Sequence, residues 1–284
     1  MSLLVLAPSR DGFALVGDSY GTPEFSRESG PIDGPRKTHV AHSRVAVGIC
    51  GASVLDYAAV VALVATTCAS YDGAWNEDFL STLEHELAAG LSRALTSYGD
   101  MRRASNLAEK EGPLSLLVLV ESDDGPIAAR YLAVPTPERV TVERDFTRAL
   151  DGRAEVTMVG RTEYVVAHVL ERPELLDEVI AFEGRRVRDV PFADTLALAR
   201  LIHAQADMTD VPVGVIRDRF ARIELPIGWI GGPLTGVFVG AGGARNLTDE
   251  ELHTKKEQVM AGSTLLGGAV SAYTTYQKLT PPKK

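Results

Sequence analysis

The sequence has little of what disulfide-bonded and metal-binding proteins need. Its two cysteines, Cys50 and Cys68, lie in apolar stretches, which predicts buried thiols in a reducing cytoplasm rather than a disulfide framework. It contains no CxxC or HExxH motif, and its six histidines are scattered along the chain. We therefore expect a cytoplasmic protein with no metal site and no cofactor.

Positive charge and long apolar runs are also scarce. The 29 Lys and Arg are outnumbered by 38 Asp and Glu, giving a net charge of −9, which argues against a nucleic-acid-binding surface. The densest basic cluster, Arg185–Arg188, lies beside Glu183 and Asp189 and is typical of a solvated face. The apolar stretch 54–69 contains an acidic residue and is too short to cross a bilayer, and the N-terminus shows no signal-peptide pattern. We expect neither nucleic acid nor membrane as a partner.

What the sequence does contain is a series of apolar runs in pairs. Turn residues separate the two runs of a pair, as in "PSRDG" at 8–12, and this pattern predicts β-hairpins. The expected strands are 3–7, 13–16, the hairpin 37–50, 113–122, 126–134, 139–144, 154–160 and a strand pair at 213–225. The expected helices are 54–71, 76–98, 162–170, 173–182 and 192–206, with a polar connector after residue 98. Strands in hairpins favour an α+β protein, in which helices cover antiparallel sheets.

The last part of the chain differs in composition. Residues 226–243 are rich in glycine and apolar residues, and Thr248 with Glu251 forms a capping box that predicts a helix. The run Gly240–Gly243 superficially suggests a phosphate-binding loop, but it lacks the third glycine of that motif, so we interpret it as a flexible hinge. We expect two domains, residues 1–225 and a C-terminal extension at 226–284.

A set of residues near the N-terminus has a specific spacing. Asp18 and Ser19 follow Ser2 by sixteen and seventeen residues, and Gly51 follows Lys37 by fourteen. This pattern resembles the proteasome-type branch of the N-terminal-nucleophile (Ntn) hydrolases, which includes bacterial proteasome-like subunits. The resemblance implies a four-layer αββα Ntn-hydrolase sandwich and assembly into a homo-oligomeric ring. An ATPase partner remains an open option.

The resemblance also implies a role for each residue. Ser2, exposed by removal of Met1, is the expected nucleophile, and its own α-amine, with a pKa near 8, is the general base. Lys37 would lower the proton affinity of this site by its charge, and Asp18 would orient Lys37. The backbone N–H of Gly51 would stabilise the oxyanion, a contribution of about 3 kcal/mol in comparable sites.

Two positions depart from the family pattern. Arg161 stands where the resemblance implies a serine, and in "DVPVG" Asp210 fits the pattern while Val213 replaces a second serine. Asp207 competes with Asp210 for the matching position. The missing hydroxyls favour a protein that has kept the fold and weakened or lost the activity.

The expected function is therefore hydrolysis of a peptide or amide bond in a peptide or protein substrate. The alternative is a non-catalytic scaffold or binding subunit, and a third reading is an amidase that acts on a small molecule. Taken alone, Ser2 is an ordinary second residue, Asp18 an ordinary turn residue and Lys37 an ordinary surface lysine. His39 and His42 are interpreted as polar residues of a strand.

Overall fold

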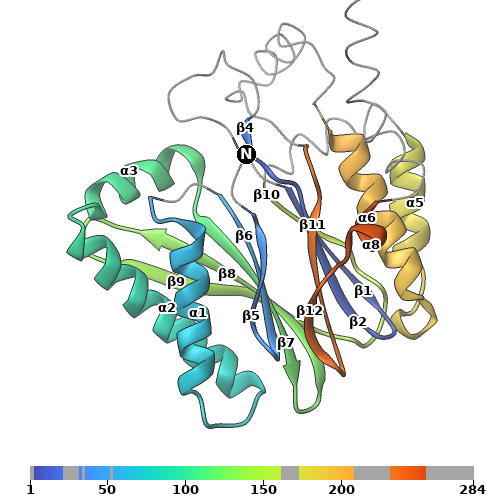
Figure 1. Cartoon of the computed structure of the whole chain (residues 1–284), viewed down its shortest axis with the longest axis horizontal. Coiled ribbons are helices and arrows are strands. Elements are labelled where there is room, and N and C mark those ends of the chain that lie inside the picture. The colour runs from blue at the N-terminus through green and yellow to red at the C-terminus, as the bar shows by residue number, and fades with distance from the viewer. Residues whose placement is uncertain are drawn as a thin grey trace, which may run out of the picture. The chain divides into compact units, whose positions relative to one another are not determined.

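The computed structural model describes residues 3–21, 32–33, 36–51, 54–160, 173–207 and 231–253. The chain divides into two compact units, residues 1–247 and 248–284, and the first contains two five-stranded antiparallel sheets flanked by helices (Figure 1). The domain boundary expected at residue 225 falls outside the described residues.

The first sheet has the strand order β10-β1-β2-β11-β12. Its strands are β1 (Leu3–Ser9), β2 (Gly12–Gly17), β10 (Thr157–Gly160), β11 (Thr235–Gly240) and β12 (Gly243–Asn246). The tight β1–β2 hairpin turns at residues 10–11, as the "PSRDG" stretch predicts. Every residue of β1 and β2 is buried, because the two strands lie inside the sheet and both of its faces are covered.

The second sheet has the strand order β5-β6-β7-β8-β9. Its strands are β5 (Thr38–His42), β6 (Val45–Cys50), β7 (Leu114–Ser122), β8 (Gly125–Pro135) and β9 (Val140–Ala149). A separate two-stranded ribbon joins β3 (Tyr20–Gly21) to β4 (Ile32–Asp33). β9 continues five residues beyond the strand expected at 139–144 and pairs with β8 along its length.

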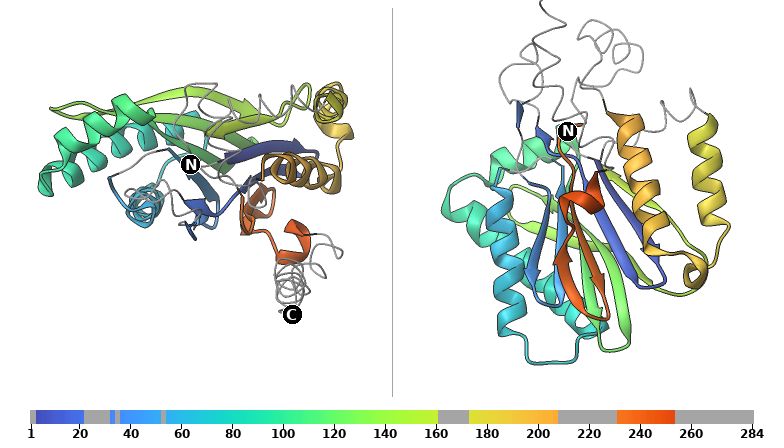
Figure 2. Two further views of the ribbon diagram at one scale, coloured as in Figure 1. Left: turned by 90° about the horizontal axis from the view of Figure 1, so that it is seen from above. Right: turned by 45° about the vertical axis from the view of Figure 1, so that its right-hand side comes forward.

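The two sheets pack face to face, and β7 shows how the sequence supports this (Figure 2). Leu117 and Leu119 belong to a core that also holds Leu4, Leu15 and Val237 of the first sheet. Leu116, Val118 and Val120 point the other way, into a second core beneath the helices. A strand buried on both faces must be apolar at every position, which explains the unbroken run at 116–120.

Three helices cover the outer face of the second sheet. They are α1 (Tyr57–Ser70), α2 (Glu77–Ser97) and α3 (Met101–Glu111). Asn76 caps α2 through its side chain, as expected, and six regularly spaced residues of α2 are buried: Phe79, Leu80, Leu83, Leu87, Leu91 and Leu95. The sequence suggested only a polar connector for α3, because most of its eleven residues are polar and the buried ones are few.

Two helices lie on the side of the first sheet. α6 (Phe192–Ala206) packs against β1 and β2, and the Thr195 hydroxyl donates to the Pro8 carbonyl oxygen at 2.8 Å. α5 (Pro173–Glu183) packs mainly against α6, and the short 3₁₀ helix η1 (Val187–Asp189) follows it. The helix expected at 162–170 and the strand pair expected at 213–225 lie outside the described residues.

The expected fold class is therefore corrected. The described residues form an α+β structure of mainly two antiparallel sheets plus a few helices, and the predicted four-layer αββα Ntn-hydrolase sandwich is not confirmed. On the side of the first sheet, within the described ranges, α6 makes the main helix contacts with β1 and β2, and α5 packs on α6. No helix among the described residues is long and apolar enough to cross a membrane.

The glycine run at 240–243 is not a hinge. Gly240 and Gly243 pair with each other at the end of the β11–β12 hairpin, and residues 241–242 form its turn. In the second unit, the short helix α8 (Asp249–Leu252) begins at Thr248 with the expected capping box to Glu251.

Candidate functional site

A buried ion pair joins the two sheets. The ammonium nitrogen of Lys37 lies 2.8 Å from Oδ2 of Asp18, and the side chains of both residues are at most 2% exposed. Removing two charges from water costs several kcal/mol per ion in proteins, so a buried pair persists only where close geometry and further hydrogen bonds offset that cost. The surroundings of this pair supply such contacts.

Hairpin geometry explains why these two residues meet. In an antiparallel hairpin, the first residue of one strand lies beside the last residue of the other. Asp18 follows β2 directly and therefore lies next to Leu3 at the start of β1, and the Asp18 N–H donates to the Leu3 carbonyl oxygen at 3.3 Å. Lys37 precedes β5 and lies next to the end of β6, where the Ile49 N–H donates to its carbonyl oxygen at 2.8 Å. The ion pair thus connects the open ends of two hairpins.

The Asp18 carboxylate also binds backbone groups. Its Oδ1 accepts from the Leu3 N–H at 2.7 Å, and Oδ2 lies 3.5 Å from the backbone nitrogen of Gly231. Hydrogen bonds from N–H groups stabilise the ionised form of a carboxylate. Asp18 therefore holds both Lys37 and the backbone of the residue that directly follows Ser2 in the sequence.

Burial changes the proton affinity of the groups around this pair. It lowers the pKa of Lys37 below its usual value, against the opposing effect of the Asp18 carboxylate. Cys50, the last residue of β6, is fully buried within electrostatic reach of the pair, and burial raises the pKa of its thiol to about 12. Its thiol stays protonated at neutral pH, so we assign Cys50 no nucleophilic role.

Gly51 directly follows β6 and has a backbone conformation that favours glycine. Its φ is +103°, and a β-carbon at this position would lie 2.7 Å from the carbonyl oxygen of Pro113. The Tyr57 hydroxyl donates to the Gly51 carbonyl oxygen at 2.7 Å and so connects Gly51 to the first residue of α1. Both the backbone conformation and the lack of space require glycine here.

An apolar pocket lies beside Gly51, on the helical side of the second sheet. Leu114 contributes to its lining and also lies within 3.3 Å of the β-carbon position of Gly51. The lining consists of Val54, Leu55, Leu91, Leu95, Ala104, Leu107, Leu114, Ala133, Pro135 and Val140. Such a lining can contact apolar groups but supplies no acid or base.

The structure brings together part of the residue set expected from the sequence. Asp18 and Lys37 are in direct contact, and Gly51 lies two residues beyond Ile49, whose N–H binds the Lys37 backbone. Ser2 and Asp210 lie outside the described residues, as do Arg161 and Val213. Asp207, the competing acidic residue, follows the last residue of α6.

Sequence reasoning missed His203 as a neighbour of the ion pair. This histidine is buried on α6, its ring nitrogen Nε2 lies 3.1 Å from the Val16 carbonyl oxygen, and Asp18 and Lys37 both act on it electrostatically. The available signal was its spacing, because His203 shares a helix face with the buried residues Ala199 and Ala206. A histidine among small apolar residues on a buried face needs a polar partner.

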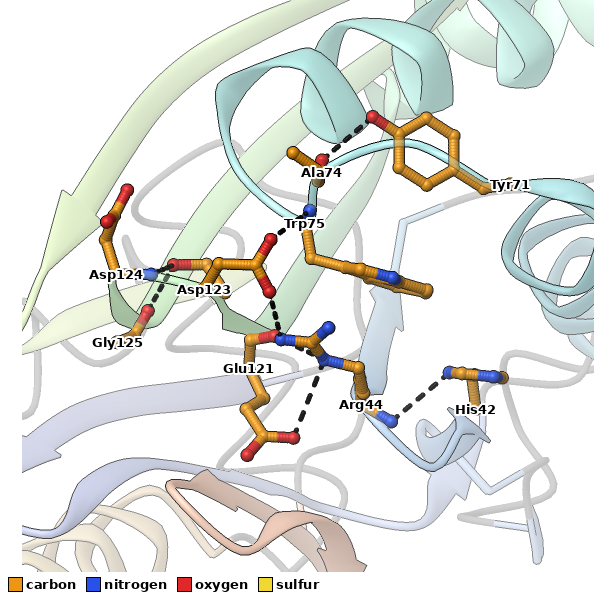
Figure 3. Close-up of polar contacts among 10 residues, drawn as sticks. His42, Arg44, Tyr71, Ala74, Trp75, Glu121, Asp123, Asp124 and Gly125 are labelled. Atoms are coloured by element: carbon orange, nitrogen blue, oxygen red, sulfur yellow. Dashed lines mark hydrogen bonds and ion pairs between the residues drawn. The ribbon is translucent and has the colours of Figure 1, made fainter.

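A second polar cluster lies at the turn end of the β5–β6 hairpin, opposite the open end where Lys37 lies, and connects three turns (Figure 3). Arg44 pairs with Asp123 at 2.8 Å and lies over the ring of Trp75, while Asp123 also accepts from the Trp75 N–H. His42 stacks on Trp75 with ring centroids 5.2 Å apart. Because the charged groups bind one another, we interpret the cluster as a brace between the β5–β6, α1–α2 and β7–β8 turns. Within the described ranges, no group of three or more His, Cys, Asp or Glu residues is placed to hold a metal ion.

Comparisons with known proteins show similarity in fold but not in sequence. No protein-family model matches the chain, and a search of curated proteins finds no relative. A similar solved structure is the helical assembly of the Anbu complex from Pseudomonas aeruginosa, with a TM-score of 0.50 and 13% identity. The match covers 99% of this chain and 98% of that one, and it fits a proteasome-like fold.

These findings correct the expected family. Membership of the proteasome-type Ntn hydrolases rested on four residues at matching spacing, and it is wrong as an assignment, because no family model matches and 13% identity reflects the fold alone. Four residues are too few to distinguish shared ancestry from a shared fold. What the comparison supports is the coarser statement of a proteasome-like fold.

Proposed function

We propose that this protein hydrolyses amide bonds in peptide or protein substrates, using the hydroxyl of Ser2 as the nucleophile after removal of Met1. The observation that carries the proposal is the buried Asp18–Lys37 pair, whose carboxylate also binds the Leu3 N–H. The Asp18 carboxylate thus binds the backbone of Leu3, the residue that follows Ser2 in the sequence. A buried lysine at that place would supply the positive charge that a terminal serine needs.

The proposed reaction needs only groups of this chain and water. The free α-amine of Ser2 takes the hydroxyl proton, and the oxygen attacks the substrate carbonyl carbon to form a tetrahedral intermediate. The amine then gives the proton to the leaving nitrogen, the C–N bond breaks and an ester remains on Ser2. Water activated by the same amine cleaves that ester. Gly51 is proposed to donate its N–H to the developing oxyanion, and Asp18 to orient Lys37.

Assembly into a proteasome-like homo-oligomer belongs to the same proposal. Its support is the similarity in fold to the Anbu complex, which is a helical assembly in the structure of that protein. We include Asp210 as a proposed supporting residue on the basis of its sequence position alone. A nucleophilic serine can be labelled whatever the natural substrate is and whether or not the chain assembles. Labelling therefore tests Ser2 alone, and the substrate class and the oligomer are tested separately.

A structural role is the second candidate. The Asp18–Lys37 pair also pins two hairpins together, which would serve a non-catalytic subunit equally well. Arg161 and Val213, which stand where hydroxyls are expected, favour this alternative.

Covalent labelling separates the two candidates. A β-lactone or peptide epoxyketone should modify the wild type and the Ser2→Thr variant, but not Ser2→Ala. Ser43→Ala, in the exposed β5–β6 turn, is the matched control and should label like the wild type. Absence of labelling in the wild type, or equal labelling of Ser2→Ala, would favour the scaffold.

A further inference from the structure

The two ring nitrogens of His203 have different surroundings. Its side chain lies on α6 and is 3% exposed, and Nε2 lies 3.1 Å from the Val16 carbonyl oxygen. Because a carbonyl oxygen can only accept, Nε2 carries the hydrogen. The other nitrogen, Nδ1, is buried and has no hydrogen-bond partner among the described residues. The ring therefore donates one hydrogen bond, from Nε2 to the Val16 carbonyl oxygen.

The hydrogen bond fixes the end of β2. Val16 precedes Asp18 by two residues, so its position affects where the Asp18 carboxylate lies. α6 is attached to the first sheet at a second point, where Thr195 donates to Pro8 of β1 at 2.8 Å. Pro8 lies at the far end of β1 from Leu3, so of these two hydrogen bonds the one from His203 lies closer to the ion pair.

Burial keeps the ring neutral. It lowers the pKa of His203 against the opposing effects of the Asp18 carboxylate and the Val16 carbonyl oxygen. The Lys37 ammonium adds a smaller lowering of this pKa, and the Asp207 carboxylate a smaller rise. A proton added at Nδ1 would be buried near Lys37 with no acceptor among the described residues. This unsatisfied donor would destabilise the packing of the ring between α6 and β2.

We propose that His203 is a positioning residue for the Asp18–Lys37 pair. Its neutral imidazole holds the end of β2 against α6 and so keeps Asp18 in contact with Lys37 and with the Leu3 N–H. The positioning of the pair stands on the geometry alone, while its effect on reactivity rests on the proposed function of Ser2. His203 itself touches no substrate.

Three variants test the proposal in the full-length protein. His203→Phe keeps an aromatic ring, of slightly larger volume, and removes the donor, and we expect labelling by the epoxyketone to slow about tenfold, the effect of losing one hydrogen bond at the site. His203→Gln places an amide N–H near the position of Nε2, and its labelling should stay within about threefold of the wild type. Thr195→Val removes the hydrogen bond between α6 and Pro8 of β1, and it should label at the wild-type rate even if it lowers stability.

The pH profile separates positioning from a merely structural role. In the wild type, protonation of His203 should add to the loss of labelling on the acid side. His203→Gln has no proton to gain at this position, so its acid limb should show only the titration of the Ser2 amine. Identical acid limbs in the two proteins would contradict the proposal.

NMR provides a readout that does not depend on activity. ¹⁵N-labelled histidine should show His203 as the neutral Nε2–H tautomer at pH 7, and the Lys37 side-chain signals should change in His203→Phe but not in His203→Gln. If the wild type is not labelled but these signals behave as expected, the proposed function fails and the positioning role stands. A charged or Nδ1–H ring, or unchanged Lys37 signals in His203→Phe, would overturn the positioning role.

Discussion

The carboxylate of Asp18 contacts the ammonium group of Lys37 at 2.8 Å across two different β-hairpins. Asp18 follows β2 of the first sheet, and Lys37 precedes β5 of the second. The pair is the charged contact through which the open ends of the hairpins meet, and Asp18 also binds the Leu3 N–H beside it. The proposed function and the role of His203 both depend on this relationship.

Replacing one member of the Asp18–Lys37 pair should lower the free energy of unfolding more than the loss of the ion pair itself does. We expect Lys37→Met and Asp18→Asn each to lower the free energy of unfolding by about 3–5 kcal/mol, because each leaves a buried polar group without its partner. The double variant should lose much less than the sum of the two, since no buried charge remains. Urea unfolding of the four proteins measures the coupling.

An exposed ion pair provides the control for this cycle. Arg148 and Glu155 lie 3.0 Å apart, and the side chain of Glu155 is 60% exposed. Glu155→Gln should change the free energy of unfolding by less than about 1 kcal/mol. Additive losses at Asp18 and Lys37 would show that the two side chains are not coupled.

Gly51→Ala tests the geometry at the end of β6. A methyl group there would lie 2.7 Å from the Pro113 carbonyl oxygen at a φ of +103°, so we expect a loss of more than about 2 kcal/mol and strongly reduced labelling. Gly125→Ala is matched in conformation, with a φ of +116°, but meets open space. Its loss should be smaller and its labelling unchanged. Thermal unfolding and labelling rates compare the two, and equal effects would exclude a steric requirement at Gly51.

The labelling rate should depend on pH in a bell-shaped manner. It should rise as the Ser2 amine loses its proton, near pH 8, because only the free amine accepts the hydroxyl proton. It should fall again as Lys37 loses its proton, at a pH below 10.5, because burial lowers the pKa of this lysine. Lys37→Arg stays positively charged over this pH range, so the fall in labelling rate on the alkaline side should move to higher pH. An unchanged alkaline limb in this variant would assign that limb to another group.

Acid should destabilise the fold through His203. Because its pKa is lower in the folded than in the unfolded state, the unfolded chain takes up the proton first as the pH falls. The stability that this residue contributes is thus present above pH 6.5, the unfolded value, and is lost as the pH falls toward the folded value. Urea midpoints between about pH 7 and pH 5 should decline less in His203→Gln than in the wild type. Parallel curves would show that His203 does not titrate differently on folding.

Local patterns were sufficient to predict the strands that lie in short hairpins. The turn at residues 10–11 and the apolar run at 116–120 specify their strands by turn chemistry and by burial on both faces. α3 was missed because most of its residues are polar, so its helical face carries only a weak apolar signal. The turn at 241–242 was mistaken for a hinge, although it closes the local β11–β12 hairpin. The neighbour of β11 on its other side is β2, more than 200 residues away in the sequence, and no local pattern marks that pairing.

The candidate site was predictable only in part. The contact between Asp18 and Lys37 was expected from the resemblance, and hairpin geometry explains it only once the two sheets are seen together. His203 and Gly231 reach the same place from the opposite end of the chain, and no local pattern marks such contacts. The family and the four-layer fold failed because a few matching positions were extended to the whole chain.

The most direct test of the central claim is the intact mass of the protein after treatment with a peptide epoxyketone, because this reagent bonds to both the hydroxyl and the free amine of a terminal serine. We predict that Met1 is absent, that one reagent molecule is added per chain, and that Ser2→Ala shows no addition. Retention of Met1, or an adduct that persists in Ser2→Ala, would contradict the account.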